Sequence, residues 1–197
     1  MTYDPNLIFS RLEPLPGSIG SFYFFDDEQA ALYVPVAGAP KGSARALPVL
    51  ANCPTTGVRN HYAGMRFVNG SGDSTKKKLD TEERAIRQAV AALWHLGFMP
   101  YDDGCKLDLD LVYSAPKARR TERKHTTYPD RDKALRAVQD HISPPRENKA
   151  PVMTSPHLVV NDSQIHGGYC EKWWLHVWNE ITGLRDDGDG IYIVLHY

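Results

Sequence analysis

The sequence is poor in cysteine, and it has neither an apolar run of membrane length nor a large excess of charge of one sign. Its three cysteines, Cys53, Cys105 and Cys170, are odd in number and widely spaced, which predicts neither a disulfide framework nor a paired-cysteine zinc site. Because no signal peptide or membrane-length segment is present, we expect a cytoplasmic protein with reduced thiols. The formal net charge of −1 over 197 residues favours no class of partner by itself.

The composition is typical of a globular chain with one core, since 42% of the residues are hydrophobic and 24% are charged. Apolar spacing predicts an α/β (α+β) fold, a mixed sheet of about four or five strands with two main helices. We expect helices over 81–96 and 132–142, and strands over 46–54, 105–113, 157–160 and 190–197. A hairpin within 21–36 belongs to a predicted N-terminal extension, 1–45, which precedes a main domain over 46–197.

Charge is distributed unevenly along the chain. Residues 117–149 carry ten Lys and Arg against five Asp and Glu, whereas residues 161–197 carry two against six. A basic centre suits a surface that follows nucleic-acid phosphates. In the segment 116–125 we expect DNA contacts, the alternative being a flexible surface loop, from Lys117, Arg119, Arg120, Arg123 and Lys124. The loop 55–78 offers either further phosphate contacts or a solvated basic run, through Arg59, Lys76, Lys77 and Lys78.

The most informative stretch, residues 128–140, reads YPDRDKALRAVQD. Asp130 and Asp132 stand at the predicted start of a helix, where Asp132 suits the N-cap position, and Arg136 follows one turn later. The predicted buried strand over 157–160 is followed by Asp162. Three carboxylates at element ends beside a cation suit an oxygen-seeking ion such as Mg²⁺. The ordinary alternative is that these residues only cap a helix and form a turn.

This pattern, D-x-D-x-x-x-K/R-x-x-x-D and then a strand closing on N/D-D-S/A-Q, resembles the RusA family of Holliday-junction resolvases. The resemblance extends over roughly residues 46–197. It implies a homodimeric, Mg²⁺-dependent endonuclease, with Mn²⁺ as a substitute ion, that cuts four-way DNA junctions in recombination and repair. It further implies that Asp130, Asp132 and Asp162 hold the metal, and that Lys172 corresponds to a lysine frequent in the family.

Two positions depart from the family pattern. Lys133 stands where the family usually has asparagine, and Arg136 stands where it has a catalytic lysine. Arginine keeps the positive charge but does not readily release a proton. Arg136 therefore suits phosphate stabilisation, with Lys133 or Lys172 assisting. The replacements leave a second interpretation open, a non-catalytic DNA-binding or phage interaction protein on the same fold.

A second acid pair, Asp108 and Asp110, falls on the predicted strand 105–113, and the alternation of that strand places both residues on its polar face. A solvated strand face is a simpler interpretation than a catalytic role. Further along, Trp173, Trp174 and Trp178 suit either stacking on unpaired bases, or a place in the core and in a homodimer interface.

Overall fold

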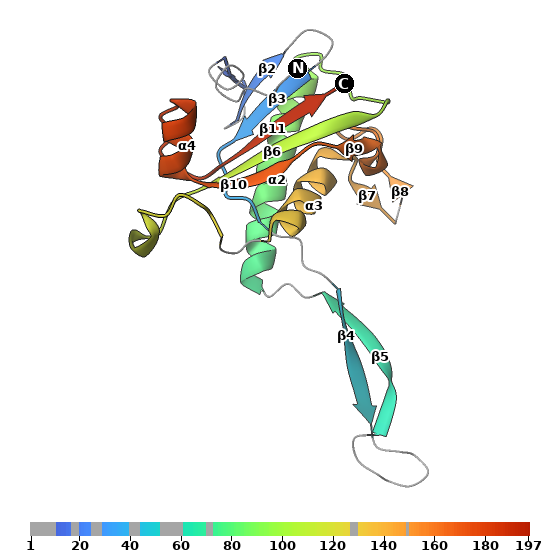
Figure 1. Ribbon diagram of the computed structural model, residues 1–197. Coiled ribbons are helices and arrows are strands. Elements are labelled where there is room, and N and C mark those ends of the chain that lie inside the picture. The colour runs from blue at the N-terminus through green and yellow to red at the C-terminus, as the bar shows by residue number, and fades with distance from the viewer. Residues whose placement is uncertain are drawn as a thin grey trace.

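The computed structural model describes residues 11–16, 20–24, 29–39, 44–51, 61–69, 73–126, 130–148 and 150–197. Within these residues the predicted α+β class is confirmed, because a mixed seven-stranded sheet is combined with three α-helices (Figure 1). The strand order is β1–β2–β3–β11–β6–β10, and β9 also pairs with β6. The strands of this sheet are β1 (Glu13–Pro14), β2 (Ser21–Phe24), β3 (Gln29–Val34), β6 (Cys105–Tyr113), β9 (Ile165–Gly167), β10 (Cys170–Trp174) and β11 (Gly190–His196).

Strand β6 lies inside the sheet, antiparallel to β11 on one side and parallel to β10 on the other. Its predicted bounds are confirmed, and Leu107 packs in the main core. The prediction of a solvated opposite face is wrong, because Asp108 is only 9% exposed and Asp110 is 0% exposed. That face is also covered, by a second apolar cluster that includes Val112 and Trp178.

Three helices complete the described fold: α2 (Asp73–His95), α3 (Arg131–Ile142) and α4 (Leu175–Thr182). The main core takes side chains from α2 and α3, whereas Trp178 of α4 belongs to the second cluster. Helix α2 begins earlier than the predicted residue 81, since no glycine or proline interrupts 73–95. None of the described helices combines the length and the apolar character needed to cross a membrane.

Helices α2 and α3 are joined by a buried polar contact as well as by apolar packing. Glu82 of α2 is 0% exposed, and its carboxylate lies 3.2 Å from Nδ1 of His141 on α3. The same carboxylate accepts a hydrogen bond from the backbone N–H of Ala39. Burial raises the pKa of Glu82. This contact fixes α3 against α2 and against the segment that follows β3.

Residues 46–51 of the strand predicted over 46–54 form a strand, and residues 52–54 lie outside the described residues. This strand is not part of the main sheet. Strand β4 (Ala44–Ala51) pairs only with β5 (His61–Asn69), in a region predicted to be a loop. Figure 1 shows this hairpin extending away from the sheet. Pro48 lacks the N–H that a central strand would donate. The place beside β11 belongs instead to β3, which forms the predicted N-terminal hairpin with β2.

The predicted strand over 157–160 is buried but does not form a regular strand. Its one ladder contact among the described residues is an isolated parallel bridge between Tyr101 and Val159. Leu158 instead donates its N–H to the carbonyl of Ile142 at the end of α3, at 2.7 Å. The short pieces around it are β7 (Arg146–Glu147), β8 (Ala150–Pro151) and the 3₁₀ turn η2 (Asp162–Gln164). The predicted closing strand over 190–197 is confirmed as β11.

Candidate functional site

The start of α3 presents two carboxylates to solvent. Asp130, not the predicted Asp132, occupies the N-cap position, and it makes no side-chain capping hydrogen bond. Its carboxylate lies 3.0 Å from Nζ of Lys133, one turn along the helix, so the carboxylate is drawn to a cation rather than to the backbone. Asp132 lies within the first turn, and its side chain is 85% exposed.

Strand β10 holds the start of α3 in place. The thiol of Cys170 donates to the carbonyl of Arg131 at 3.9 Å, and Nη1 of Arg131 lies 3.5 Å from the Glu171 carboxylate. Nε of the same guanidinium lies 3.8 Å from Oδ1 of Asp132. Burial raises the pKa of Cys170 to about 12, so this residue is a packed thiol and not a thiolate ligand. Arg131 therefore lies between Asp132 and Glu171.

Lys172 is the cation of β10, and its charge interacts with that of Asp130. Burial lowers the pKa of Lys172, and the negative charge of Asp130 opposes that change. That Lys172 assists at the phosphate, as the resemblance implies, remains a prediction. Arg136 lies further along α3 with an exposed side chain.

The basic segment 114–126 is an ordered part of the fold, and it contains the 3₁₀ turn η1 (Lys117–Arg119). Trp174, the last residue of β10, donates its indole N–H to the carbonyl of Lys124 at 3.2 Å. Arg123 donates twice to the Glu180 carboxylate of α4, at 3.1 Å each. Arg119 donates to Glu122 at 3.0 Å. These contacts fix the backbone that carries the predicted DNA-binding cations.

His125 anchors the end of this segment. Its ring lies between those of Tyr113 and Trp174, with centroid distances of 4.6 and 4.0 Å. The residue is 8% exposed, and burial together with the positive charge of Lys172 lowers its pKa to about 4. His125 is therefore neutral at pH 7 and serves as an aromatic anchor.

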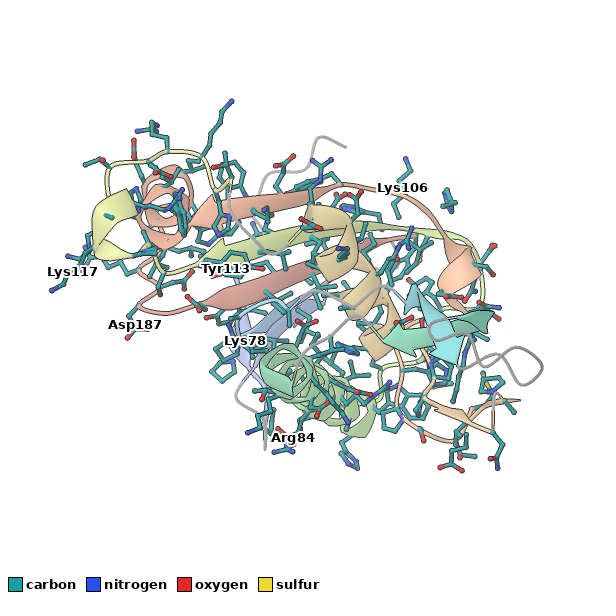
Figure 2. The ribbon with its side chains drawn as sticks, turned by 90° about the horizontal axis from the view of Figure 1, so that it is seen from below. Lys78, Arg84, Lys106, Tyr113, Lys117 and Asp187 are labelled. Carbon is teal, nitrogen blue, oxygen red and sulfur yellow. The ribbon has the colours of Figure 1, made fainter. Side chains whose placement is uncertain are left out.

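Figure 2 shows where the basic segment lies relative to the sheet. Lys117 and Asp187 lie at one end of the molecule, and Lys106 lies towards the other. Tyr113, the last residue of β6, lies towards the same end of the molecule as Lys117. In the sheet, Tyr113 pairs with Trp174 of β10. From Glu171 to Trp174 the chain advances about 10 Å, at about 3.3 Å per residue. The acid pair and the basic segment therefore flank one short stretch of β10.

Asp162, the third predicted acid, lies elsewhere. It begins η2, where Asn161 and Gln164 form a capping box. It lines a cavity of about 580 Å³ together with Asp140 near the end of α3, whereas Asp132 lines a different cavity, of about 450 Å³. Among the residues that the structure describes, no group of three Asp, Glu, His or Cys is placed to hold a metal ion. Asp130 and Asp132 both lie at the start of α3, where each contacts a different cation, and Asp162 lines a cavity that neither of them lines.

The remaining predicted cations are dispersed. Lys76, Lys77 and Lys78 are exposed near the beginning of α2, and Arg59 lies outside the described residues. In the basic segment, Lys117, Arg120 and Lys124 are exposed. Of the predicted cations, Lys133 and Lys172 lie on α3 and β10, the Lys124 backbone contacts the end of β10, and Arg123 pairs with α4.

Asp108 and Asp110 are buried supports of the segment that precedes β10. Asp110 accepts hydrogen bonds from the hydroxyl of Tyr169 at 2.6 Å and from the indole of Trp173 at 2.7 Å. Asp108 accepts from the backbone N–H of Tyr169 at 2.9 Å, and it contacts Nε2 of His196 at 2.7 Å. Their hydrogen-bond partners lie about sixty residues or more away along the chain. The alternation within 105–113 therefore could not predict that these two aspartates are buried.

Sequence reasoning missed Arg131, Tyr169 and Glu171, which line the cavity beside Asp132. A signal was present for two of them. Arg131 lies between the two acids in sequence, and Glu171 precedes Lys172 in an otherwise apolar stretch. Charged residues in a short apolar strand indicate an edge, which is where β10 lies.

Comparison with known proteins gives little further information. No family model matches the chain. A stretch of 123 residues is 28% identical to a protein of Thermotoga neapolitana described as probable M18 family aminopeptidase 1. The match covers 59% of this chain and 26% of that protein, so the chain spans about a quarter of the length of this curated relative.

Proposed function

We propose that this protein binds branched DNA and cleaves its backbone in a metal-dependent reaction, with four-way junctions as the substrate class. The observation that carries the proposal is the position of β10 between the acidic start of α3 and the basic segment. Glu171 of β10 contacts Arg131, which lies between the two acids in sequence, the charge of Asp130 acts on Lys172, and Trp174 holds the basic segment. A nuclease needs both, since cations bind the backbone and acids serve the reacting phosphate.

The spacing along β10 suits a continuous nucleic-acid strand. About 10 Å corresponds to about three steps of duplex DNA at 3.4 Å each. A backbone that contacts Lys124 or Arg120 would therefore reach Asp130 and Asp132 within a few nucleotides. Because the basic segment is already ordered, binding would cost little conformational entropy there.

The metal part of the proposal rests on the resemblance to the RusA family. As placed, the acids do not fit an ion site: Asp130 and Asp132 each lie against a basic neighbour, and Asp162 lines another cavity. We therefore derive no catalytic step through Mg²⁺. In the proposed reaction Arg136, Lys133 and Lys172 bind phosphate oxygens as fixed cations.

A second candidate is a DNA-binding protein without nuclease activity. The ion pairs of Lys133 with Asp130 and of Arg131 with Asp132 favour it, because a cation of the chain itself already neutralises each carboxylate. The two candidates share the DNA-binding surface and differ only in cleavage. One experiment can therefore separate them.

The test is cleavage of a synthetic four-way junction with Mg²⁺, measured beside junction binding in EDTA. Under the metal-dependent mechanism that the resemblance implies, we expect the wild-type protein to cut the junction, and Asp132→Asn to lose at least about 100-fold in cleavage rate while it still binds. Asp187→Asn, which makes the same charge change at a residue in the turn before β11, should cut normally. Binding without cleavage by the wild-type protein would favour the second candidate, and absence of both would end the proposal.

A further inference from the structure

The cavity of about 450 Å³ beside Asp132 is lined by apolar side chains as well as by acidic ones. It lies between α3 and the segment that joins β9 to β10. Its apolar side chains are Leu107, Leu135 and Ile165, and Gln139, Arg131, Asp132 and Glu171 supply polar groups. The volume falls within the range of small-molecule sites, about 300–1,000 Å³.

One face of α3 forms a wall of this cavity. Asp132, Leu135 and Gln139 follow one another at spacings of three and four residues, which places them on the same side of a helix. The buried residues Ala134, Ala137 and Val138 occupy the other side. The wall thus passes from a carboxylate through an apolar side chain to an amide.

The opposite wall is shaped by close approach of the backbone. Gly168 has φ +117°, and a Cβ atom built on it would lie 1.9 Å from the carbonyl oxygen of Leu107. Only glycine fits there, so the segment lies directly against β6. Asp108 and Asp110 then fix Tyr169 through its backbone N–H and its hydroxyl. Because Asp110 lies on the face of β6 opposite α3, the Tyr169 ring turns to that face, and it is the backbone at Tyr169 that lines the cavity.

We propose that this cavity receives one unpaired nucleobase of the strand whose backbone lies along β10. The proposal rests on the proposed function, and it identifies a feature of the substrate: a base beside the reacting phosphate leaves its stack. A base is flat and apolar on its faces, which suits the side chains of Leu135 and Ile165. Its edge carries donors and acceptors, which suit the Gln139 amide and the carboxylates.

Charge and position favour a nucleobase over an apolar ligand. The cavity includes Asp132, which adjoins the proposed reaction site, and Arg131, whose guanidinium can stack on a base or bind the adjoining phosphate. A four-way junction offers unpaired or easily unpaired bases at its crossover, where unstacking costs least. Asp108 and Asp110 act as positioning residues for the backbone at Tyr169, which forms part of the cavity wall.

The test combines a base deletion in the DNA with a filled cavity in the protein. Junctions with one abasic nucleotide at each position near the crossover are bound in EDTA, which prevents metal-dependent cleavage. For the wild-type protein we expect one or two abasic positions to weaken binding about 10-fold. For Leu135→Trp we expect the intact junction to bind about 10-fold more weakly, with no further loss at those positions.

Two further variants make the result interpretable. Gln139→Trp fills the cavity from one turn further along α3, in case Leu135→Trp does not fold. Met99→Trp adds the same side chain at a residue that is 78% exposed and lines neither cavity, and it should behave as wild type. Abasic penalties that persist in both filled variants, or no penalty at any position, would overturn the base site. In the latter case, cleavage of the intact junction with Mg²⁺ would leave the proposed function standing.

Discussion

At the scale of single residues, His125 connects the packing of the basic segment with pH. Its ring is enclosed by Tyr113 and Trp174, and burial lowers its pKa to about 4 from 6.5. The folded protein therefore binds fewer protons at this residue than the unfolded chain does between those two values. The stabilisation is complete above about pH 6.5 and is lost as the pH falls towards 4. Neutral His125 also keeps another positive charge away from Lys172.

His125→Phe should remove this pH dependence while it keeps the aromatic packing. The lowering of the His125 pKa from 6.5 to about 4 corresponds to up to about 3 kcal/mol of unfolding free energy. We expect the variant to match the wild type within about 1 kcal/mol at pH 7 and to exceed it near pH 4.5, as measured by urea unfolding at both pH values. Parallel loss of stability in both proteins on acidification would contradict the assignment to His125. His95→Phe is the matched control at an exposed histidine.

At the scale of elements, the basic segment and α4 form one unit. Arg123 is held by both carboxylate oxygens of Glu180, yet the two side chains are 67% and 57% exposed. An exposed pair of this kind contributes at most about 1 kcal/mol to stability. Its larger consequence is that Glu180 competes with phosphate for Arg123. The carboxylate orders the segment and at the same time limits its positive charge.

Glu180→Gln should therefore strengthen DNA binding with little change in stability. Releasing Arg123 adds about one phosphate contact, so the slope of log K against log salt should steepen by about 0.9. The measurement is junction binding by fluorescence anisotropy over a series of salt concentrations. Glu147→Gln makes the same charge change at an exposed residue of β7 and should leave the slope unchanged. An equal effect of both substitutions would mean that only net charge matters.

Element by element, the sequence predicted what depends on local pattern. The alternation in 105–113 gave the bounds of β6, and the apolar stripe in 134–142 gave α3. The sequence-based predictions were wrong where burial or strand pairing depends on residues far away along the chain. The burial of Asp108 and Asp110 depends on Tyr169, Trp173 and His196. Likewise, β3 and not β4 pairs with β11, so β4 pairs with β5 outside the main sheet. The local sequence pattern does not show which strand pairs with β11.

At the scale of the whole molecule, the separation of Asp162 from the acid pair distinguishes the fold from the family pattern. The resemblance predicts one group of three carboxylates, whereas the structure places Asp132 and Asp162 in two cavities that share no lining residue, and Asp130 lines neither of them. Spacing in sequence could not reveal this, because residues 143–160 form short irregular pieces and not the regular strand expected before Asp162. The predicted homodimer and the magnesium ion remain predictions.

Asp162→Asn tests whether Asp162 acts together with Asp130 and Asp132 or separately, from its own cavity. If Asp162 acts from its own cavity, the substitution should lower junction cleavage by less than about 10-fold, well below the loss expected for Asp132→Asn. Cleavage rates of both variants under the same Mg²⁺ concentration provide the comparison. Equal losses would contradict the arrangement described here and would require Asp162 to join the acid pair when DNA and metal bind.

The most direct test of the placement of DNA along β10 is cleavage mapping from two tethered iron chelates on a bound four-way junction. In a Cys53→Ser background, which leaves the two buried cysteines Cys105 and Cys170, one chelate is attached at Asp132→Cys and the other at Arg120→Cys. We expect the two sets of radical cuts to fall on one strand, a few nucleotides apart, beside the crossover. Cuts on different arms of the junction, or none from Asp132→Cys, would contradict a single DNA path along this strand.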